Sequence, residues 1–154
     1  PELAFGALAE GATEPLLNPE IVAACNLSAA DIAAVRAREE AELRRRQSLY
    51  LAGRGRPDPR GRAAILVDDG LATGASARAA LRALRARGAS PLILAIPVAP
   101  ADSIAAIADE CDRVVCAEVS DIPAGIGGCY ADFHQLEDDE VLALLRGAAG
   151  QASP

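Results

Sequence analysis

The stretch of sequence that decides the fold is A-I-L-V-D-D-G-L-A-T-G-A-S, at residues 64–76. Four apolar residues lead into two adjacent carboxylates, Asp68 and Asp69, and then into a loop of small and hydroxyl-bearing residues. An Ala/Leu/Arg segment with helical spacing follows. This order predicts a buried strand, an acidic pair, a loop and a helix. The carboxyl end of a strand that faces a helix N-terminus is where open α/β sheets bind phosphorylated ligands.

The loop after the acidic pair has the composition of an anion-binding turn. Small residues let backbone N–H groups approach a phosphate, hydroxyl groups add donors, and the start of the helix adds partial positive charge. No Lys follows Gly74, so the loop is not the G-x-x-x-x-G-K-[ST] loop of nucleotide triphosphatases. The G-x-G-x-x-G pattern of dinucleotide-binding sites is also absent. We expect a monoester phosphate here, the alternative being a tight turn without a ligand. The predicted phosphate-binding residues are Gly70, Leu71, Ala72, Thr73, Gly74, Ala75 and Ser76.

The acidic pair, Asp68 and Asp69, needs polar partners, because a carboxylate is costly to bury unpaired. Adjacent strand residues point to opposite faces, so both can reach one site only if the strand ends there. Sugar hydroxyls or a hydrated Mg²⁺ ion would satisfy them. We therefore predict Asp68 and Asp69 as catalytic residues and as indirect ligands of Mg²⁺.

The pattern downstream of residue 62 alternates between strands and helices. Strands are predicted over residues 63–67, 91–98 and 113–117, and helices over residues 76–87, 101–110 and 138–146. Residues 121–131 are irregular by composition. Such alternation indicates βαβ units, a parallel sheet and helices on both of its faces.

The first 62 residues are less regular. A short strand or half of a hairpin is predicted over residues 2–9, a loop over 13–18, and a short helix over 21–25 after Asn18. Ser28 begins a long helix in which arginines alternate with glutamates. We favour a solvated helix with ion pairs; the alternative is that some arginines face an anionic substrate. Residues 51–62 are predicted to form an arginine-rich loop, which is either an anion-facing or mobile segment or an ordinary exposed connection.

Composition limits the possible functions. A length of 154 residues suggests one domain, divided into an N-terminal part at 1–62, an α/β core at 63–147 and a tail at 148–154. A net charge of -7 argues against general nucleic-acid binding, and no apolar run is long enough to span a membrane. The four cysteines lack C-x-x-C spacing and are expected to be buried thiols, which fits a cytoplasmic protein.

The segment at 64–76 resembles the signature with which type I phosphoribosyltransferases bind phosphoribosyl pyrophosphate (PRPP). The whole chain resembles a group of bacterial predicted phosphoribosyltransferases, which share P-E-L-A-F-G-A at 1–7, the basic helix, and an aromatic-acidic stretch like Y-A-D-F at 130–133. The resemblance implies a three-layer αβα fold with a mainly parallel sheet. It assigns Asp68 and Asp69 to the ribose hydroxyls and the loop to the 5′-phosphate. It also implies PRPP or a nucleoside monophosphate as ligand, Mg²⁺ as cofactor, and a possible homodimer.

In that family a nitrogen nucleophile displaces pyrophosphate from C1 of the ribose, and this chain departs from the pattern at two places. Ala72 stands where purine-using members often carry an acid, which disfavours hypoxanthine or guanine as acceptor, although orotate enzymes also lack that acid. No R-G-G-like turn for pyrophosphate precedes Asp68, and the chain begins with Pro1 and contains no Met. We therefore expect an N-terminally incomplete chain that is weak or inactive alone.

Three functions remain open at this point: a phosphoribosyltransferase, a non-catalytic PRPP- or nucleotide-binding or regulatory module, and a hydrolase that acts on a phosphosugar. Tyr130 or Phe133 could stack on a base, although packing in the core is the favoured interpretation. The sequence assigns no role to His134.

Overall fold

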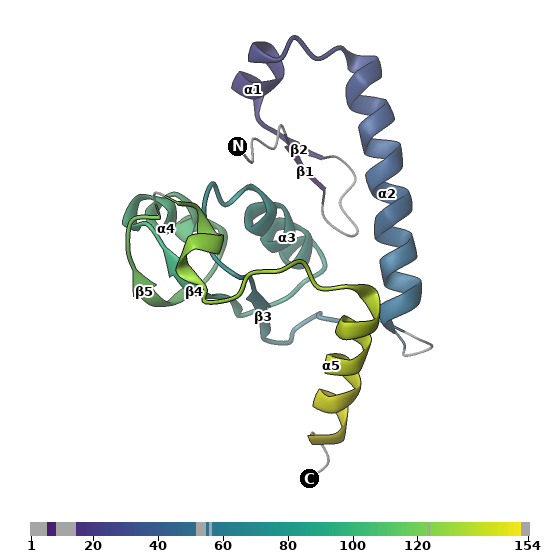
Figure 1. Cartoon of the computed structure of the whole chain (residues 1–154), viewed down its shortest axis with the longest axis vertical. Helices are drawn as coiled ribbons and strands as arrows, with labels where there is room; N and C mark the ends of the chain where they lie inside the picture. Colours follow the sequence, from purple (N-terminus) through teal and green to yellow (C-terminus); the bar gives the residue numbers. More distant parts are fainter. Residues whose placement is uncertain (1–5, 9–14, 52–54, 56, 123, 152–154) are drawn as a thin grey trace.

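Three parallel strands form the central sheet of the molecule (Figure 1). The computed structural model describes residues 6–8, 15–51, 55, 57–122 and 124–151. Within them, β3 (Ala64–Val67), β4 (Leu92–Ala99) and β5 (Arg113–Val119) are paired in the order β3-β4-β5. The predicted α/β class and parallel sheet are confirmed, and β5 continues two residues beyond its predicted end.

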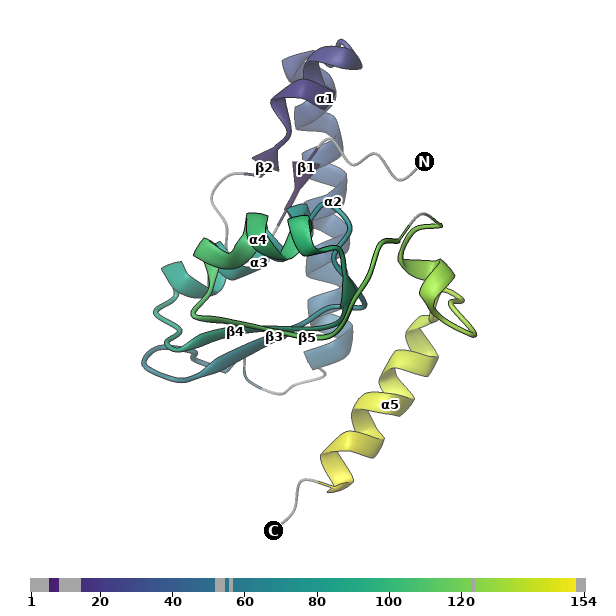
Figure 2. The ribbon, with the colours of Figure 1, turned by 90° about the vertical axis from the view of Figure 1, so that its left-hand side faces the viewer.

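Helices α3 (Ala75–Ala86) and α4 (Ala101–Ile107) connect these strands and lie over the same face of the sheet (Figure 2). The sheet grows in one direction from β3 to β5, so two crossovers of the same hand pass over one face. The prediction that these crossovers place helices on both faces is therefore wrong for α3 and α4 (Figure 2). The core fills this layer, where Leu81, Leu94 and Ile107 have no exposed surface.

The opposite face of the sheet keeps its apolar side chains exposed. Ile65 and Val67 of β3 are 63% and 73% exposed, and Val115 and Val119 of β5 are 45% and 59% exposed. These residues alternate with the buried or half-buried positions of the same strands, as the two-residue period of a strand requires. The α3–α4 layer is therefore the side on which the sheet acquires its core.

The N-terminal part begins with a small antiparallel pair, β1 (Gly6–Ala7) and β2 (Leu16–Leu17). β1 confirms half of a hairpin within residues 2–9, while residues 2–5 and 9 of that prediction lie outside the described residues. The predicted loop over 13–18 is wrong at Leu16–Leu17, because these leucines pair with β1 in place of remaining unpaired.

Both helices of the N-terminal part have the capping residues that the sequence indicated, although α1 begins two residues before the predicted range of 21–25. Asn18 caps α1 (Pro19–Ala24) by accepting from the amide of Glu20 at 3.1 Å. Ser28 precedes α2 (Ala29–Leu51), and Ser28 and Asp31 form a reciprocal capping box, in which the amide of Ser28 donates to Asp31 Oδ2 at 3.0 Å and the amide of Asp31 donates to Ser28 Oγ at 3.2 Å.

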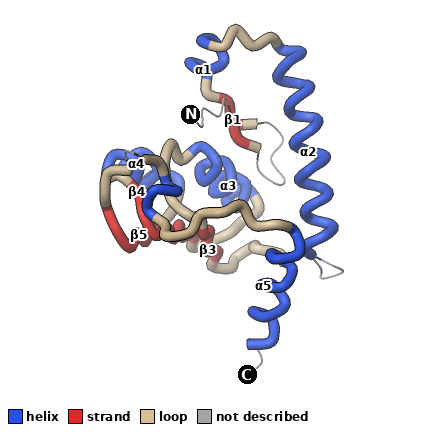
Figure 3. Tube along the Cα trace, in the orientation of Figure 1, coloured by secondary structure: helices blue, strands red, loops and turns tan. Residues whose placement is uncertain are grey.

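The polar surface of α2 is laced with ion pairs, as the favoured interpretation predicted. Arg46 Nε lies 2.7 Å from Glu42, and Arg45 bridges Glu42 and Asp138 at 2.7 Å each. The hydroxyl of Tyr50 also donates to Asp138 at 2.6 Å. These contacts tie α2 to the start of α5 (Asp138–Gln151), which projects from the body of the molecule (Figure 3).

Two short 3₁₀ turns complete the fold. One, η1 (Ala108–Glu110), extends α4 to the predicted end of that helix, and the other, η2 (Ile126–Cys129), lies in the segment predicted to be irregular. Residues 152–154 of the predicted tail lie outside the described residues, and α5 itself continues past residue 146 to Gln151.

Burial of the thiols matches the prediction only in part. Cys111 is buried and Cys116 half-buried, whereas Cys25 and Cys129 are exposed, so the expectation of buried thiols is wrong for the last two. No helix in the described part of the chain combines the length and the apolar character needed to cross a bilayer.

The α3–α4 layer carries the stability of the fold, and a matched pair of leucines tests this. Leu94→Ala removes a side chain with no exposed surface and should lower the free energy of unfolding by about 2–5 kcal/mol. Leu144→Ala, on α5 at 62% exposure, should change it by less than about 0.5 kcal/mol. Urea denaturation of both variants measures the difference; equal losses would contradict this assignment of the core.

Candidate functional site

The predicted acidic pair lies at the carboxyl edge of the sheet, where β3 ends. The amide of Asp68 still donates to the carbonyl oxygen of Ala95 at 3.3 Å, so pairing with β4 continues one residue beyond β3. Asp68 is half-buried and Asp69 is exposed. The strand ends between them, as joint use of the two carboxylates requires.

The Asp68 carboxyl is held in place and partly shielded from water. Its Oδ1 accepts from the amide of Asp69 at 3.0 Å. Desolvation raises the pKa of Asp68 above its ordinary value of 3.8, against the opposing effect of that hydrogen bond, and the charge of Asp69 adds to the rise. An ionised Asp68 therefore gains from any ligand that donates hydrogen bonds to it.

Leu71 departs from its predicted role as a phosphate ligand. Its amide donates to the carbonyl oxygen of Val98 at 3.2 Å, and its side chain is 1% exposed in the main core cluster. That amide is turned into the protein, so it is not available to a phosphate. The sequence could not distinguish this residue because an apolar side chain in a Gly/Ala-rich loop fits both a turn and a core anchor.

The open amides of the predicted loop lie at the start of α3. Gly74 adopts φ 71°, and the first amide to bond back along the helix is that of Arg78, which donates to Gly74 at 2.8 Å. The amides of residues 75–77 precede this ladder and have no acceptor within the helix. Ser76 and Thr73 are exposed beside them. This arrangement places amide donors without a helical acceptor at residues 75–77, which overlap the end of the predicted range of 70–76.

Two contacts fix the rest of this loop. Ser103 of α4 donates its hydroxyl to the carbonyl oxygen of Ala72 at 2.7 Å. A methyl group placed on Gly70 would lie 2.5 Å from Ile126 Cδ1 and 3.1 Å from the carbonyl oxygen of Val98. The backbone at Gly70 is therefore pressed between β4 and η2, and only a residue without a side chain fits.

The segment after β5 contacts the main chain of the acidic pair, a contact that the sequence did not predict. The hydroxyl of Tyr130 donates to the carbonyl oxygen of Asp69 at 2.6 Å. The Tyr130 and Phe133 rings lie 5.1 Å apart between centroids and remain 36% and 47% exposed. Packing in the core, the favoured interpretation for both residues, is therefore wrong. The Y-A-D-F stretch was the available signal.

His134 lies next to this segment but faces other carboxylates. Its Nδ1 is 3.0 Å from Asp132 Oδ1, and its Nε2 is 3.5 Å from Glu140. Asp132, followed by Glu140, raises the pKa of His134 above its ordinary value of 6.5. These contacts link the segment to the first turn of α5.

The acidic pair fits a magnesium ion only in partnership with a ligand. Among the described residues no group of three or more His, Cys, Asp or Glu side chains is arranged to hold a metal. Magnesium commonly binds through one or two carboxylates together with the phosphates of a substrate and water. Asp68 and Asp69 match the one or two carboxylates that the protein supplies in such a site.

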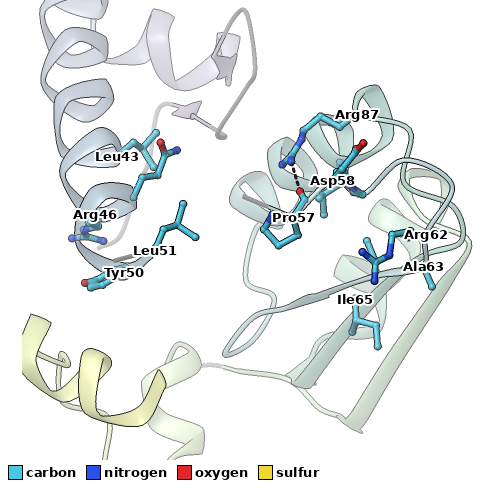
Figure 4. Close-up of a pocket in the computed structure, with 14 residues that line it drawn as sticks. Leu43, Arg46, Tyr50, Leu51, Pro57, Asp58, Arg62, Ala63, Ile65 and Arg87 are labelled. Atoms are coloured by element: carbon cyan, nitrogen blue, oxygen red, sulfur yellow. Dashed lines mark hydrogen bonds between the residues drawn. The ribbon is translucent and has the colours of Figure 1, made fainter. Parts of the chain in front are cut away.

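A sizeable cavity lies elsewhere, next to the start of β3. About 660 Å³ opens between the last turns of α2 and the start of β3, at the end of β3 opposite to Asp68 (Figure 4). Leu43 and Leu51 face Ile65 across it, and Arg87 on its rim donates to the carbonyl oxygen of Pro57 at 3.0 Å. Its walls are mainly apolar, and none of the predicted site residues lines it.

Comparison with known proteins decides the family. A family model described as "Phosphoribosyl transferase domain" matches residues 11–134, which is well over half of the chain. The chain belongs to the phosphoribosyl transferase domain family. This match includes the acidic pair, the loop and the Tyr130 segment.

Individual relatives of this family agree. The chain is 43% identical over 145 residues to "Putative phosphoribosyl transferase Rv0571c" and to "Putative phosphoribosyl transferase MT0597", both from strains of Mycobacterium tuberculosis. These alignments cover 94% of this chain and 32% of each relative, so the chain spans about a third of the length of the curated relatives it matches.

A solved structure confirms the fold. The crystal structure of TT1426 from Thermus thermophilus matches with a TM-score of 0.68 and 34% sequence identity, over 94% of this chain and 68% of that one. The αβα fold of the phosphoribosyltransferase type, expected from the signature at 64–76, is therefore confirmed.

The raised pKa of Asp68 predicts an unusual stability effect. Asp68→Asn should raise the free energy of unfolding at pH 7, by at most about 1 kcal/mol because solvent still screens a half-buried carboxyl. A carboxyl whose pKa is higher in the folded protein favours folding below pH 3.8 and loses that contribution as the pH rises through the raised pKa. The difference between variant and parent should therefore vanish in acid.

Asp112→Asn is the control of opposite sign. Asp112 accepts from the amide of Leu92 at 2.6 Å and from Arg85 at 3.0 Å, in that order of importance, and both lower its pKa. This variant should be less stable at pH 7. The stability that ionised Asp112 provides is lost as the pH falls through its lowered pKa. Thermal unfolding across pH measures both, and a destabilised Asp68→Asn protein at pH 7 would contradict the assignment.

The close approach at Gly70 predicts a specific steric coupling. Gly70→Ala should lower the free energy of unfolding by about 1–3 kcal/mol, because the new methyl group meets Ile126 and the backbone of β4. Ile126→Val removes the nearest atom and should recover part of the loss in a double-mutant cycle. Gly55→Ala, with nothing within 4 Å, should be nearly neutral. Additive losses at 70 and 126 would show that the two residues do not touch.

Proposed function

We propose that this chain is a phosphoribosyl-binding domain of a phosphoribosyltransferase. It would bind PRPP or a nucleoside 5′-phosphate at the carboxyl edge of β3. Family membership supports the reaction class, and the names of the Mycobacterium tuberculosis relatives agree with it. The location expected for such a domain is the cytoplasm.

The observation that carries the proposal is the juxtaposition of two kinds of group across one short turn. Carboxylates at Asp68 and Asp69 accept hydrogen bonds, and the free amides of residues 75–77 donate them. A ribose 5-phosphate presents hydroxyl donors at one end and phosphate acceptors at the other. The turn therefore offers complementary chemistry to both ends of one ligand.

In the transfer step the bond between C1 of the ribose and the pyrophosphate oxygen breaks, and a bond from C1 to a nitrogen of the acceptor forms. The acidic pair would orient the ribose diol and place negative charge near the cation-like sugar. The amides at the start of α3 would anchor the 5′-phosphate, and positioning then lowers the barrier. Mg²⁺, when bound with the substrate, would offset the charge of the leaving pyrophosphate.

The acceptor would approach from the side of Tyr130 and Phe133. Their rings are partly exposed, lie 5.1 Å apart and adjoin the acidic pair through Tyr130. Such a surface suits a planar, nitrogen-containing ring. Ala72 leaves no carboxylate within the loop to assist a purine nitrogen.

A non-catalytic PRPP- or nucleotide-binding or regulatory module is the second candidate. It is favoured by Ala72 and by a site in which the described residues offer binding groups for the ribose and the 5′-phosphate. The two candidates share the same ligand contacts and differ in turnover. Release of pyrophosphate from PRPP in the presence of nucleobase acceptors would identify the transferase, and binding without release would identify the module.

Calorimetric titration with PRPP and Mg²⁺ tests the site itself. The parent protein should bind, and Asp69→Asn should bind about tenfold more weakly or worse, because a neutral amide accepts less strongly from the ribose hydroxyls. Asp139→Asn, which removes one charge from another adjacent acidic pair, should bind like the parent. Equal affinity of the Asp69→Asn protein and the parent would mean that the acidic pair is not the ribose site.

A further inference from the structure

We propose that Tyr130 is a positioning residue for the acidic pair. Its hydroxyl fixes the main chain of Asp69 and thereby sets the direction of the carboxylates toward the ligand. The inference rests on the proposed function, because it assigns Tyr130 to the same ligand site. It concerns the phenol oxygen rather than the face of the ring.

The hydrogen bonds of the Asp69 peptide groups carry this inference. The amide of Asp69 donates to Asp68 Oδ1 at 3.0 Å, and the carbonyl oxygen of Asp69 accepts from the hydroxyl of Tyr130 at 2.6 Å. The backbone is thus held on both sides of the Asp69 Cα atom. The second of these bonds is the one made from outside the turn, across 61 residues of sequence.

Tyr130 lies in a segment that makes further contacts on both sides of it. Upstream, Ile126 is 9% exposed and packs against Gly70. Downstream, the Phe133 ring lies against both the Tyr130 ring and Gly127, where an added methyl group would come within 2.9 Å of it. The η2 segment and the residue after it therefore contact the acidic turn at two successive positions, through Ile126 on Gly70 and through Tyr130 on Asp69.

The protonation state of Tyr130 suits a donor. Desolvation, followed by the charge of Asp69, raises the pKa of Tyr130 above its ordinary value of 10.0. The phenol keeps its proton at neutral pH. The carbonyl oxygen of Asp69 has no proton to donate, so it can only accept a hydrogen bond. The direction of the bond is therefore fixed at neutral pH, with Tyr130 as the donor and the main chain of Asp69 as the acceptor.

The molecule also contains a matched control. Its other tyrosine, Tyr50, donates an equally short 2.6 Å hydroxyl bond, to Asp138 at the junction of α2 and α5. Tyr50→Phe and Tyr130→Phe remove the same atom and the same kind of bond. Only Tyr130→Phe disturbs the acidic turn, so the difference between the two variants isolates the positioning effect from general loss of a tyrosine hydroxyl.

Two measurements on the full 154-residue protein test the inference. The first is hydrogen exchange of the backbone in residues 68–71, which should accelerate in Tyr130→Phe and stay unchanged in Tyr50→Phe. The second is titration with ribose 5-phosphate and, separately, with inorganic phosphate. Tyr130→Phe should weaken ribose 5-phosphate binding by about three- to tenfold. It should leave phosphate binding unchanged, because phosphate uses the amides of α3. A merely structural role would weaken both ligands or neither.

The outcomes separate this inference from the proposed function. Unchanged exchange in Tyr130→Phe overturns the inference whatever the ligand data show. Faster exchange with unaltered ribose 5-phosphate affinity overturns it as well, because the carboxylates then do not depend on Tyr130. If the parent protein binds neither ligand, the proposed function fails and the positioning role falls with it. If Asp69→Asn weakens binding of ribose 5-phosphate and Tyr130→Phe does not, the proposed function stands and the inference about Tyr130 is wrong.

Discussion

The burial of Leu71 is the constraint on which the carboxyl edge of the sheet depends. Its side chain is 1% exposed in one cluster with Leu81 and Ile107, and its amide is bonded to the carbonyl oxygen of Val98. These two interactions draw the chain inward immediately after the acidic pair. The backbone must then change direction to begin α3. Gly74, the residue before the helix, allows this change by adopting φ 71°.

This anchoring explains why the turn can expose polar groups on both of its flanks. An anion-binding loop cannot use all of its amides as ligands, because something has to hold the loop itself. Here the amide of Leu71 and the carbonyl oxygen of Ala72 are bonded within the protein, the latter to Ser103. The amides at 75–77 are left open, and the side chains of Asp68 and Asp69 remain on the other flank. The contacts of Leu71 and Ala72 with the protein interior thus hold the turn in place.

Sequence patterns predicted the elements better than the contacts among them. The β3 strand, the α3 helix and the capping box at Ser28 follow from local apolar spacing and side-chain chemistry, and all three are found. The roles of Leu71 and Tyr130 were missed for one physical reason. Each is decided by a partner far away in the sequence, Val98 for one and Asp69 for the other. The pairing of Leu16–Leu17 with β1 is a smaller example of the same effect.

The two ends of β3 are chemically unlike, and this difference favours the carboxyl edge as the proposed site over the cavity at the other end. The 660 Å³ cavity beside α2 has mainly apolar walls, and at least two of its polar groups, Arg46 and Arg87, already bond within the protein, to Glu42 and Pro57. The carboxyl edge instead holds a carboxylate whose pKa is raised by desolvation and helix amides with no partner in their own helix. Polar groups without partners lower the stability of the fold. A ligand that forms hydrogen bonds with such groups at the carboxyl edge would therefore stabilise the protein. The presence of a cavity alone would point to the other end of β3, where Arg46 and Arg87 already have partners within the protein.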